Sequence, residues 1–460
     1  MKRAVVLSSL LAISVIFMFL QIYFLSFHNR SNGRDHTELT AEIRHHEKSM
    51  ASPNNVIKLF VNITAAHNVP VFLIDPSILQ TIVNYQKSGT KTVGKCKYLC
   101  HSRLVTTFAI LHNHWNPQTQ FLVTLKKNGF TWTHTTGQDP RLLSVPSMNA
   151  IDVSLHYLFI NSHHVIHLVI FFERNDNYWW HGPITLQDTF DSHIETIGLN
   201  LSAVLIGQHA GAYDKMEIMQ FKADGLKINV PRYPTLFLEQ VPHSQFIECN
   251  YARAKEFLDK NGDDNSADAV HFRVKAKNLL SKAKELLDQI GIQFWLSSGT
   301  CLGWFRECNT ISHSKDVDIG IWIKDYDVRL IPALQMSGLH LKHIFGKRED
   351  SFELSFLADD IKLDIFFFYE EGNTMWNGGT QVKSAKKFKY VFPRFTLCWT
   401  EFLGMKVRVP CQSQAYIEAN YGKDWNTRVM EWDWKKNPPN VQENGYWDSN
   451  EWSQVMQIFG

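Results

Sequence analysis

The hydrophobic pattern of the chain begins with an almost uninterrupted apolar run from Ala4 to Phe27. This run is longer than the roughly 20 residues that a helix needs to cross a bilayer, and it lacks the polar face of a helix in a soluble core. Lys2 and Arg3 precede it, and no small-residue cleavage site follows it. The pattern predicts that residues 1–27 form a cytosolic tip and an uncleaved signal anchor of single-pass type II topology, with all later residues in the lumen of the secretory pathway.

Beyond the anchor, the balance of apolar and polar positions divides the chain into three segments. Residues 28–55 are polar, with few apolar positions, and are predicted to form a stem. Residues 56–242 and 243–460 both contain short apolar runs typical of buried strands, together with stretches that have the period of amphipathic helices. The pattern predicts an α/β fold with two lumenal domains and a boundary near Pro242.

One helix can be placed from periodicity alone. Apolar residues recur at intervals of three and four from Phe272 to Ile290, which gives the segment a single apolar face. Ser266 is suited to cap the N-terminus of this helix, and Gly291 is suited to end it. A further helix is expected from about Phe246 to Leu258, as the first element of the second domain.

Candidate chemistry is concentrated in the second domain, on two predicted strands. Side chains alternate between faces along a strand, so Asp316 and Asp318 of the sequence DVDIG point the same way. Asp364 is a lone carboxylate in the apolar strand 362–368, where an unpaired buried charge would be costly. Three carboxylates suit a hard divalent cation, so we predict that these residues hold Mg²⁺ or Mn²⁺. Solvated strand ends also carry such D-x-D pairs by chance, and Asp364 is alternatively the base for an acceptor hydroxyl.

A turn of small residues upstream predicts a phosphate site beside these carboxylates. Backbone N–H groups of Ser298, Gly299 and Thr300 can approach a phosphate because their side chains are small. Arg306 is a second candidate for binding phosphate, with an ordinary surface position as the alternative. A metal next to this turn would bridge a diphosphate and neutralise the charge on a leaving group. The combination predicts metal-dependent phosphoryl transfer from a nucleotide.

The residues of this region resemble the signature of the LicD family of phosphotransferases, in the segments SSGTCLGWFREC and DVDIG between 297 and 320. Supporting segments are WNGGTQ at 376–381, FTLCWTE at 395–401 and YGKDW at 421–425, and the family match covers about Phe272 to Trp434. The resemblance implies a nucleotidyltransferase-type fold for the second domain. The chain departs from bacterial members at residues 312–315, Ser-His-Ser-Lys, so no metal-site role is assigned to these four.

Similarity to the members of this family that act on animal glycoproteins runs nearly end to end and implies a specific reaction. It is the transfer of ribitol 5-phosphate from CDP-ribitol to the N-acetylgalactosamine of the phosphorylated O-mannosyl glycan (core M3) on α-dystroglycan. The resemblance also implies a Golgi membrane location and association with other O-mannosyl glycan enzymes. Nothing in the motifs themselves identifies cytosine, ribitol or the glycan. Two alternatives stay open, a Golgi glycosyltransferase that uses its D-x-D with a nucleotide sugar and a non-enzymatic scaffold for other glycan-modifying enzymes.

Three segments of the first domain parallel segments of the second in the same order. Residues 69–73 parallel 292–296, residues 166–172 and 180–182 parallel 361–367 and 376–378, and residues 225–231 parallel 404–410. The ordered set predicts an ancient duplication. In this alignment Val169 replaces Asp364, so the first domain is predicted to be a degenerate, non-catalytic copy retained for packing or acceptor recognition. Arg174 and Asp176 are expected on its exposed surface.

Charge and cysteine content narrow the remaining possibilities. The chain has 47 Lys and Arg against 45 Asp and Glu, which argues against nucleic acid as a partner. Seven cysteines in an oxidising lumen predict disulfides with at least one cysteine left over. Cys96 and Cys100 are expected to form a local disulfide or to be unrelated thiols, with half of a zinc site as the alternative. Sequons at Asn29, Asn62 and Asn200 are consistent with a lumenal location.

Two features near the C-terminus have both a structural and a functional interpretation. The basic run from Lys383 to Tyr390, followed by Arg394, is predicted to be a solvated loop, and contact with an anionic donor is the alternative. Five tryptophans are either core residues, which we favour, or platforms on which a sugar stacks, namely Trp425, Trp432, Trp434, Trp447 and Trp452.

Overall fold

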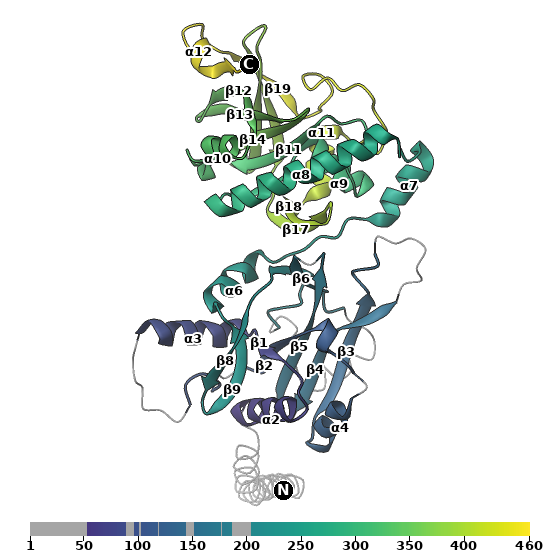
Figure 1. Ribbon diagram of the computed structural model, residues 1–460, viewed down its shortest axis with the longest axis vertical. Coiled ribbons are helices and arrows are strands. Elements are labelled where there is room, and N and C mark those ends of the chain that lie inside the picture. The colour runs from purple at the N-terminus through teal and green to yellow at the C-terminus, as the bar shows by residue number, and fades with distance from the viewer. Residues whose placement is uncertain are drawn as a thin grey trace, which may run out of the picture.

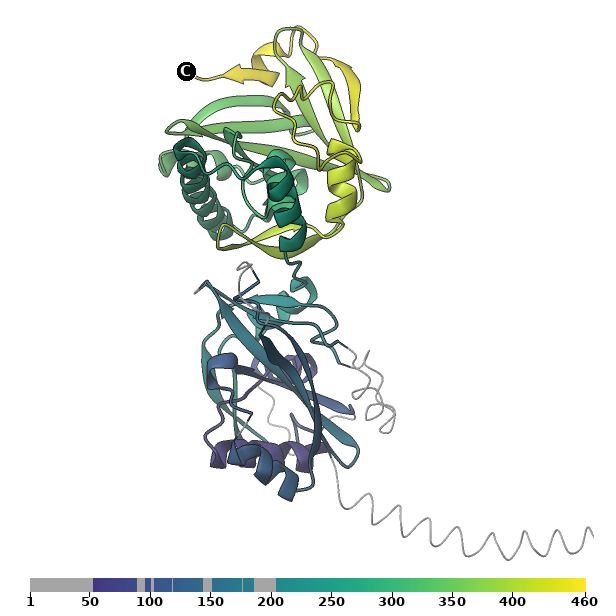
Figure 2. The same cartoon turned by 90° about the vertical axis from the view of Figure 1, so that its right-hand side faces the viewer.

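The computed structural model describes residues 53–88, 96–100, 103–117, 119–143, 151–175, 177–185 and 204–460. The predicted anchor and nearly all of the predicted stem lie outside these ranges. Of the residues described, none belong to a helix that is both long and apolar enough to cross a membrane. The chain folds into two α/β units that lie end to end (Figure 1 and Figure 2).

The first unit is built on a seven-stranded mixed sheet of order β1-β2-β5-β4-β3, with β6 pairing with β5 and β7. Strands β2 and β5 are parallel, and the other neighbours are antiparallel. Central strand β5 is buried along nearly its whole length, which explains its continuous apolar run. The elements are α2 (Pro53–Ala66), β1 (Phe72–Leu73), α3 (Pro76–Ser88), β2 (Val105–Leu111), α4 (Gln120–Lys127), β3 (Thr131–Gln138), β4 (Asp152–Asn161), β5 (His164–Arg174), β6 (Tyr178–His181), β7 (Gly211–Asp214), the hairpin β8 (Ile218–Ala223) and β9 (Leu226–Pro231), and α6 (Pro234–Gln240).

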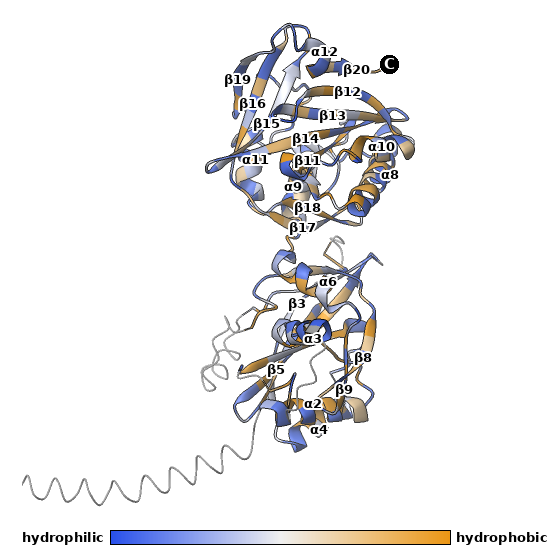
Figure 3. Ribbon diagram, turned by 90° about the vertical axis from the view of Figure 1, so that its left-hand side faces the viewer, coloured by the Kyte–Doolittle hydropathy of each residue, from blue (hydrophilic) through white to orange (hydrophobic). Residues whose placement is uncertain are grey.

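The second unit is built on a nine-stranded sheet of order β19-β16-β15-β14-β13-β12-β20, with β11 lying between β10 and β14. Its largely hydrophobic central strand is β14 (Figure 3). The elements are α7 (Tyr251–Asn261), α8 (Ala267–Ile290), β10 (Phe294–Leu296), α9 (Ser298–Glu307), β11 (Asp316–Trp322), α10 (Leu330–Met336), β12 (His340–Lys347), β13 (Asp350–Ala358), β14 (Ile361–Glu371), β15 (Thr374–Gln381), β16 (Lys386–Pro393), the hairpin β17 (Leu397–Phe402) and β18 (Met405–Pro410), α11 (Ser413–Tyr421), β19 (Val441–Tyr446), α12 (Trp452–Val455) and β20 (Met456–Ile458).

The helix predicted from periodicity is confirmed as α8. The Ser266 side chain accepts a hydrogen bond from the N–H of Ala269, and Gly291 ends the helix with a φ of 77°. Its apolar face packs into the core of the second unit, against the sheet. The helix expected from about Phe246 begins later, at Tyr251, because Phe246 instead forms an isolated β-bridge with Trp399.

The order of elements and the strand pairings from β1 to α6 in the first unit are repeated from β10 to α11 in the second, whereas β19, α12 and β20 have no counterpart among the described residues of the first. In each unit a helix leads into a short first strand, β1 or β10, which is antiparallel to the second strand, β2 or β11. The second strand is parallel to the fifth, β5 or β14. The fifth strand is antiparallel to the fourth, and the fourth is antiparallel to the third. Each unit then has a hairpin and a short helix. Tyr213 stacks on Phe237 of α6 with ring centroids 5.2 Å apart, and Phe392 stacks on Tyr416 of α11 at 4.6 Å. This shared topology supports the predicted duplication.

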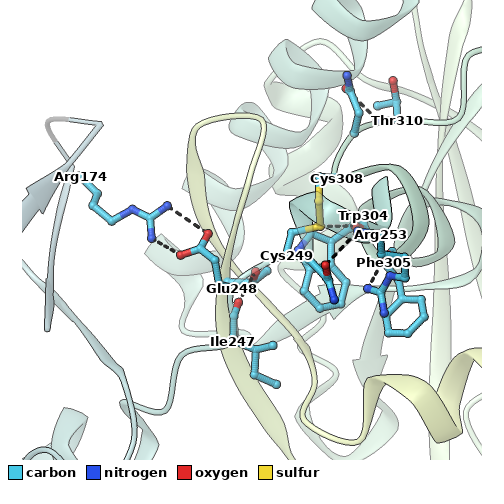
Figure 4. The surroundings of a disulfide bond; sticks show 12 residues. Arg174, Ile247, Glu248, Cys249, Arg253, Trp304, Phe305, Cys308 and Thr310 are labelled. Carbon is cyan, nitrogen blue, oxygen red and sulfur yellow. Dashed lines mark hydrogen bonds and ion pairs between the residues drawn. A yellow bond between two sulfur atoms is a disulfide. The ribbon is translucent and has the colours of Figure 1, made fainter. Parts of the chain in front are cut away.

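A group of charged side chains around the buried Arg174 joins the two units (Figure 4). Arg174, at the end of β5, is 4% exposed and donates to Glu248 from Nη1 at 2.5 Å and from Nη2 at 3.2 Å. Its Nη2 also lies 3.0 Å from Glu401 on β17, which accepts a 2.7 Å hydrogen bond from the Tyr178 hydroxyl. The prediction that Arg174 is exposed is therefore wrong, because its guanidinium links the units. Asp176 lies outside the described residues.

Six of the cysteines form three disulfides. Cys96 pairs with Cys100, so the local disulfide is confirmed over the zinc half-site. Cys249 pairs with Cys308, which ties the start of the second unit to the end of α9 (Figure 4). The third disulfide joins Cys398 and Cys411 across the β17–β18 hairpin. The leftover cysteine is Cys301, which is buried.

The basic run near the C-terminus is a strand and not the predicted solvated loop. Most of it belongs to β16, which pairs with β15 and β19 inside the second sheet. Its three lysines are each paired with a carboxylate, in the pairs Lys386–Glu443, Lys387–Asp350 and Lys389–Glu371. These charges are therefore already neutralised within the protein.

Candidate active site

The three predicted carboxylates converge on the second sheet. Asp316 and Asp318 lie on β11, which runs parallel to β14, and the register places Asp318 directly beside Asp364. Each residue offers an oxygen within 4.8 Å of the others. Asp318 and Asp364 are each 7% exposed, while Asp316 is half-buried at the start of its strand. The predicted convergence of the three carboxylates is therefore confirmed, although Asp318 and Asp364 are 46 residues apart along the chain.

This group carries more negative charge than the protein balances. Burial raises the pKa of Asp318 well above its usual range, and the charges of Asp316 and Asp364 raise it further. In the part of the chain that the structure describes, Lys362 is the cationic side chain paired with this group, with Nζ 3.2 Å from Asp364 and 3.8 Å from Asp316. A partly buried set of oxygen ligands with excess negative charge is the donor set that Mg²⁺ or Mn²⁺ prefers, so these residues fit the predicted metal.

Hydroxyl groups bond to the carboxylates of Asp316 and Asp364 and to the backbone of Asp318. Ser314 donates to Oδ1 of Asp316 at 2.9 Å, and Ser355 on β13 donates to Oδ1 of Asp364. Thr300 accepts a hydrogen bond of 2.8 Å from the N–H of Asp318. Ser314 belongs to the stretch in which this chain departs from bacterial LicD sequences, so that stretch does support the site, through a hydrogen bond to Asp316.

The predicted phosphate turn forms the first turn of α9, directly against Asp318. The N–H of Thr300 points to Oδ2 of Asp318 at 3.4 Å, so it is directed at a carboxylate and not at an open phosphate position. A Cβ on Gly299 would lie 3.3 Å from the same oxygen, which explains the small residue. Ser298 takes a left-handed conformation with a φ of 41° and lines the cavity. A phosphate role for Ser298 and Gly299 stays a prediction.

Arg306 lies in the last turn of α9 and is not an ordinary surface residue. It is 4% exposed, its Nη2 and Nε donate to Glu307 at 2.5 and 3.0 Å, and its Nη1 donates to the carbonyl of Trp425 at 3.3 Å. The guanidinium also lies over the ring of Phe257 at 4.4 Å. Most of its donors are therefore engaged within the protein, although the residue lines the cavity.

The carboxylates open into a cavity of about 580 Å³. Its lining includes the three carboxylates, the start of α9 and aromatic residues that follow α11, among them Trp425, Trp432 and Trp434. Trp432 and Trp434 are 39% and 38% exposed, so they are available as platforms. Trp447 is instead buried in a small apolar cluster away from the cavity lining. A cavity of this volume, lined by both charged and aromatic side chains, suits a nucleotide and a sugar together.

Several lining residues were missed by sequence reasoning. Glu353 on β13 lies 3.3 Å from His343 on β12, and Asn377 on β15 and Lys362 complete the polar wall. Only Lys362 had a signal in the sequence, because it stands two positions before Asp364 and therefore shares its face. The others come together only through the antiparallel pairing of β12 to β15.

The matching positions of the first unit carry no such carboxylates. Leu73 pairs with Phe108 in the first unit as Leu296 pairs with Ile319 in the second, and this equivalence aligns the second strands of the two units. In that alignment, Val105 and Thr107 occupy the positions of Asp316 and Asp318. Thr107 pairs with His167 as Asp318 pairs with Asp364. The predicted equivalence of Val169 with Asp364 is therefore wrong by two positions. The pairs Phe172–Trp180 and Tyr369–Trp376 give the same offset.

The first unit contains buried histidines in the region that corresponds to the aspartate group. His156 Nδ1 lies 3.0 Å from His167 Nε2, and His156 Nε2 lies 2.8 Å from the carbonyl of Gly182. Burial lowers the pKa of His156 to about 4 and that of His181 to about 3, so these imidazoles are neutral at ordinary pH. Among the described residues, the aspartate group of the second unit is the set of three that can hold a metal.

Comparisons with known proteins match both parts of the chain to family models. The family model described as Fukutin N-terminal matches residues 1–277, and the model described as LicD/FKTN/FKRP, nucleotidyltransferase domain, matches residues 291–412. Ribitol-5-phosphate transferase FKTN of Homo sapiens is 48% identical over 408 residues, which cover 88% of each chain. The chain belongs to the fukutin family. The LicD resemblance is therefore confirmed, and the second unit has a nucleotidyltransferase-type domain.

Other relatives of this fukutin-family chain are also found. The protein of the same name from Mus musculus is 48% identical, with 88% of each chain covered. An uncharacterized protein of Caenorhabditis elegans is 25% identical over 261 residues, or 53% of this chain and 67% of its own length. Among solved structures, the lincosamide antibiotic adenylyltransferase LnuA covers 30% of this chain at 14% identity with a TM-score of 0.21, which is too low to support any argument.

Proposed function

We propose that this protein is a ribitol-5-phosphate transferase whose active site is the aspartate group of the second unit. The observation that carries the proposal is the convergence of Asp316, Asp318 and Asp364 at the start of α9, inside the domain matched by the LicD model. The curated relatives bear the name of this activity at 48% identity over most of the chain. In the reaction, an acceptor hydroxyl oxygen bonds to the phosphorus of ribitol 5-phosphate, the bond to the nucleotide breaks, and the electron pair leaves with the nucleotide.

The roles of the carboxylates follow from their positions. Asp316 and Asp318 would hold Mg²⁺ or Mn²⁺ against the donor diphosphate, where the metal supplies neutralisation of the charge on the leaving group. Asp364 either completes the ligand set or accepts the proton of the acceptor hydroxyl. Ser355 and Ser314 keep the carboxylate oxygens of Asp364 and Asp316 oriented.

The donor, acceptor and location extend the proposal. CDP-ribitol is the donor, and the acceptor is the N-acetylgalactosamine of the phosphorylated O-mannosyl glycan (core M3) on α-dystroglycan. The enzyme would act as a single-pass type II protein of the Golgi membrane, alongside fukutin-related protein and other O-mannosyl glycan enzymes. The first unit would be a degenerate, non-catalytic copy, since Val105, Thr107 and His167 replace the carboxylates.

The test is transfer by the purified full-length chain, with CDP-ribitol or UDP-sugars as donors and a synthetic core M3 glycan as acceptor. Transfer from CDP-ribitol that stops in EDTA and returns with Mg²⁺ supports the proposal, and transfer from a UDP-sugar alone points to the glycosyltransferase instead. Asp318→Asn should reduce turnover at least about 100-fold, nearly as much as Asp318→Ala, since an amide is a poor Mg²⁺ ligand. Asp327→Asn, at an exposed pair with Arg329, is the matched control. Turnover of Asp318→Asn within a few-fold of the parent would show that the metal assignment is wrong, and absence of transfer from either donor would leave the scaffold as the better explanation.

A further inference from the structure

Lys362 lies inside the aspartate group and not merely near it. The parallel register of β11 and β14 pairs Asp316 with Lys362 and Asp318 with Asp364, so the four side chains form a two-by-two patch on the face that lines the cavity. The lysine Nζ contacts two of the three carboxylates, at 3.2 and 3.8 Å. Its side chain is 43% exposed, so the ammonium reaches both the carboxylates and the open cavity.

Comparison with the first unit shows which residue types around this patch are shared by both units and which occur in the second unit alone. Its register pairs Val105 with Val165 and Thr107 with His167, at the places of Asp316 with Lys362 and Asp318 with Asp364. The lysine is therefore lost together with the three carboxylates. The buried positions that alternate with them stay apolar in both units, as Ile166 and Leu168 correspond to Leu363 and Ile365. A lysine needed for packing would have remained in the first unit.

A lysine in this place conflicts with a metal. An ammonium and a divalent cation repel each other, and both would use the oxygens of Asp316 and Asp364. Lys362 has a flexible four-carbon stem with three N–H donors, so it can leave the carboxylates without any change in the strand. The cavity side is where the donor diphosphate must lie, and Arg306 is engaged by Glu307 while the lysines of β16 have their own carboxylates.

We propose that Lys362 is a donor-binding catalytic residue, which pairs with Asp316 and Asp364 in the metal-free enzyme and turns to the donor diphosphate once a divalent cation is held. This inference rests on the proposed function. The acceptor oxygen forms a bond to the ribitol phosphorus, the bridging P–O bond breaks, and its electron pair stays on the departing CMP. Lys362 donates hydrogen bonds to that phosphate and transfers no proton, and the acceptor proton passes to Asp364 or to solvent.

A purely structural role predicts different measurements. If Lys362 only held the carboxylates together, removing it would weaken metal binding and donor binding alike. If it competes with the metal and then binds the donor, removing it should strengthen metal binding and weaken donor binding. Opposite signs in two equilibrium measurements therefore separate the two roles without reference to turnover.

The experiment compares full-length Lys362→Met and Lys362→Arg with the parent. Lys324→Met, which removes an exposed ion pair with Glu370 in the same domain, is the matched control. Mn²⁺ binding without nucleotide is followed by electron paramagnetic resonance, and CDP binding at saturating Mn²⁺ by calorimetry. We expect Lys362→Met to bind Mn²⁺ about three- to tenfold more tightly, because two partly exposed ion pairs are removed. It should bind CDP about 10- to 100-fold more weakly, as for the loss of a charge-assisted hydrogen bond, with a matching fall in turnover.

Lys362→Arg should keep part of the CDP affinity, and Lys324→Met should match the parent. Unchanged CDP affinity and turnover in Lys362→Met would overturn the proposal, and so would weaker Mn²⁺ binding in that variant. If the parent itself binds no Mn²⁺ and transfers ribitol phosphate in EDTA, the metal-dependent function is wrong, and this outcome is visible before any variant is made.

Discussion

Replacement of Asp318 by asparagine should make the metal-free protein more stable while it abolishes metal binding. Asp318 is 7% exposed and has two other carboxylates within 4.8 Å. Two unit charges at 4.8 Å repel by about 3.5 kcal/mol at an effective dielectric constant of 20 and by about 0.9 kcal/mol in water, so each neighbour contributes between these limits. The amide keeps the shape of the side chain but forfeits part of its hydrogen bonding to the N–H of Thr300, worth about 1 kcal/mol.

The net expectation is a gain of about 1–3 kcal/mol in the free energy of unfolding in EDTA. With a divalent cation the order should reverse. The parent gains about 2.7 kcal/mol when the metal is present at 100 times its Kd, whereas the variant has lost a ligand and gains little. Urea unfolding of both proteins in EDTA and in excess Mg²⁺ measures all four values. The same or lower stability of Asp318→Asn in EDTA would refute the reasoning, because the three carboxylates would then not repel one another in the folded state.

Three further predictions concern the framework around the site. Arg174→Met should lower the free energy of unfolding by about 3–5 kcal/mol, since Glu248 and Glu401 are left without their cation. Lys255→Met, at the exposed pair with Asp259, should cost less than about 1 kcal/mol in the same urea titration. Similar values for both variants would contradict the link through the buried Arg174. Replacing both Cys249 and Cys308 by serine removes a disulfide that spans 59 residues and should cost about 4 kcal/mol of stability. Replacing Cys96 and Cys100, which are separated by 4 residues, should cost about 2 kcal/mol. Thermal unfolding in the absence of reductant should therefore show the larger shift in melting temperature for the first pair. Burial raises the pKa of the Cys301 thiol, so a thiol reagent should label no cysteine in the native protein and one after unfolding without reductant; rapid native labelling would show that Cys301 is accessible.

The sequence predicted those features that depend on neighbouring residues. The apolar period of three and four predicted α8, and the capping residues Ser266 and Gly291 predicted its ends. The alternation of side chains in DVDIG predicted two carboxylates on one face. Asp364 was found because a charge in an apolar strand requires a reason. The features that were missed depend on contacts between distant segments. Arg174 looked like a surface residue because its partners, Glu248 and Glu401, lie 74 and 227 residues away along the chain.

The misplaced equivalence of Val169 has a similar origin. Strands of apolar residues resemble one another at any even offset, because a slip of two positions keeps every side chain on its face. Sequence comparison therefore detected the repeated strand but could not fix its register. The partner strand fixes the register. The carbonyl of Thr107 accepts a hydrogen bond from the N–H of Ile74, just after β1, and the carbonyl of Asp318 accepts one from the N–H of Ser297, just after β10. Once these partners are known, His167 falls opposite Asp364 and the lysine comparison becomes possible.

If the first unit is the degenerate copy that we propose, the same strand explains how it could lose its chemistry and still be needed. On β5, His167 stands at the position of the lost carboxylate, and Arg174 stands seven residues further on, which is about 23 Å along an extended strand. The corresponding strand β14 carries Asp364 at one end and Glu371 at the other, where Glu371 is 61% exposed and paired with a lysine of β16. The site and the contact with the other unit thus lie at opposite ends of β5. Under that proposal, histidine and valine could replace the charged residues at one end of β5 without changing the Arg174 end, so the unit would keep its contact with the second unit without the charges that a reaction requires.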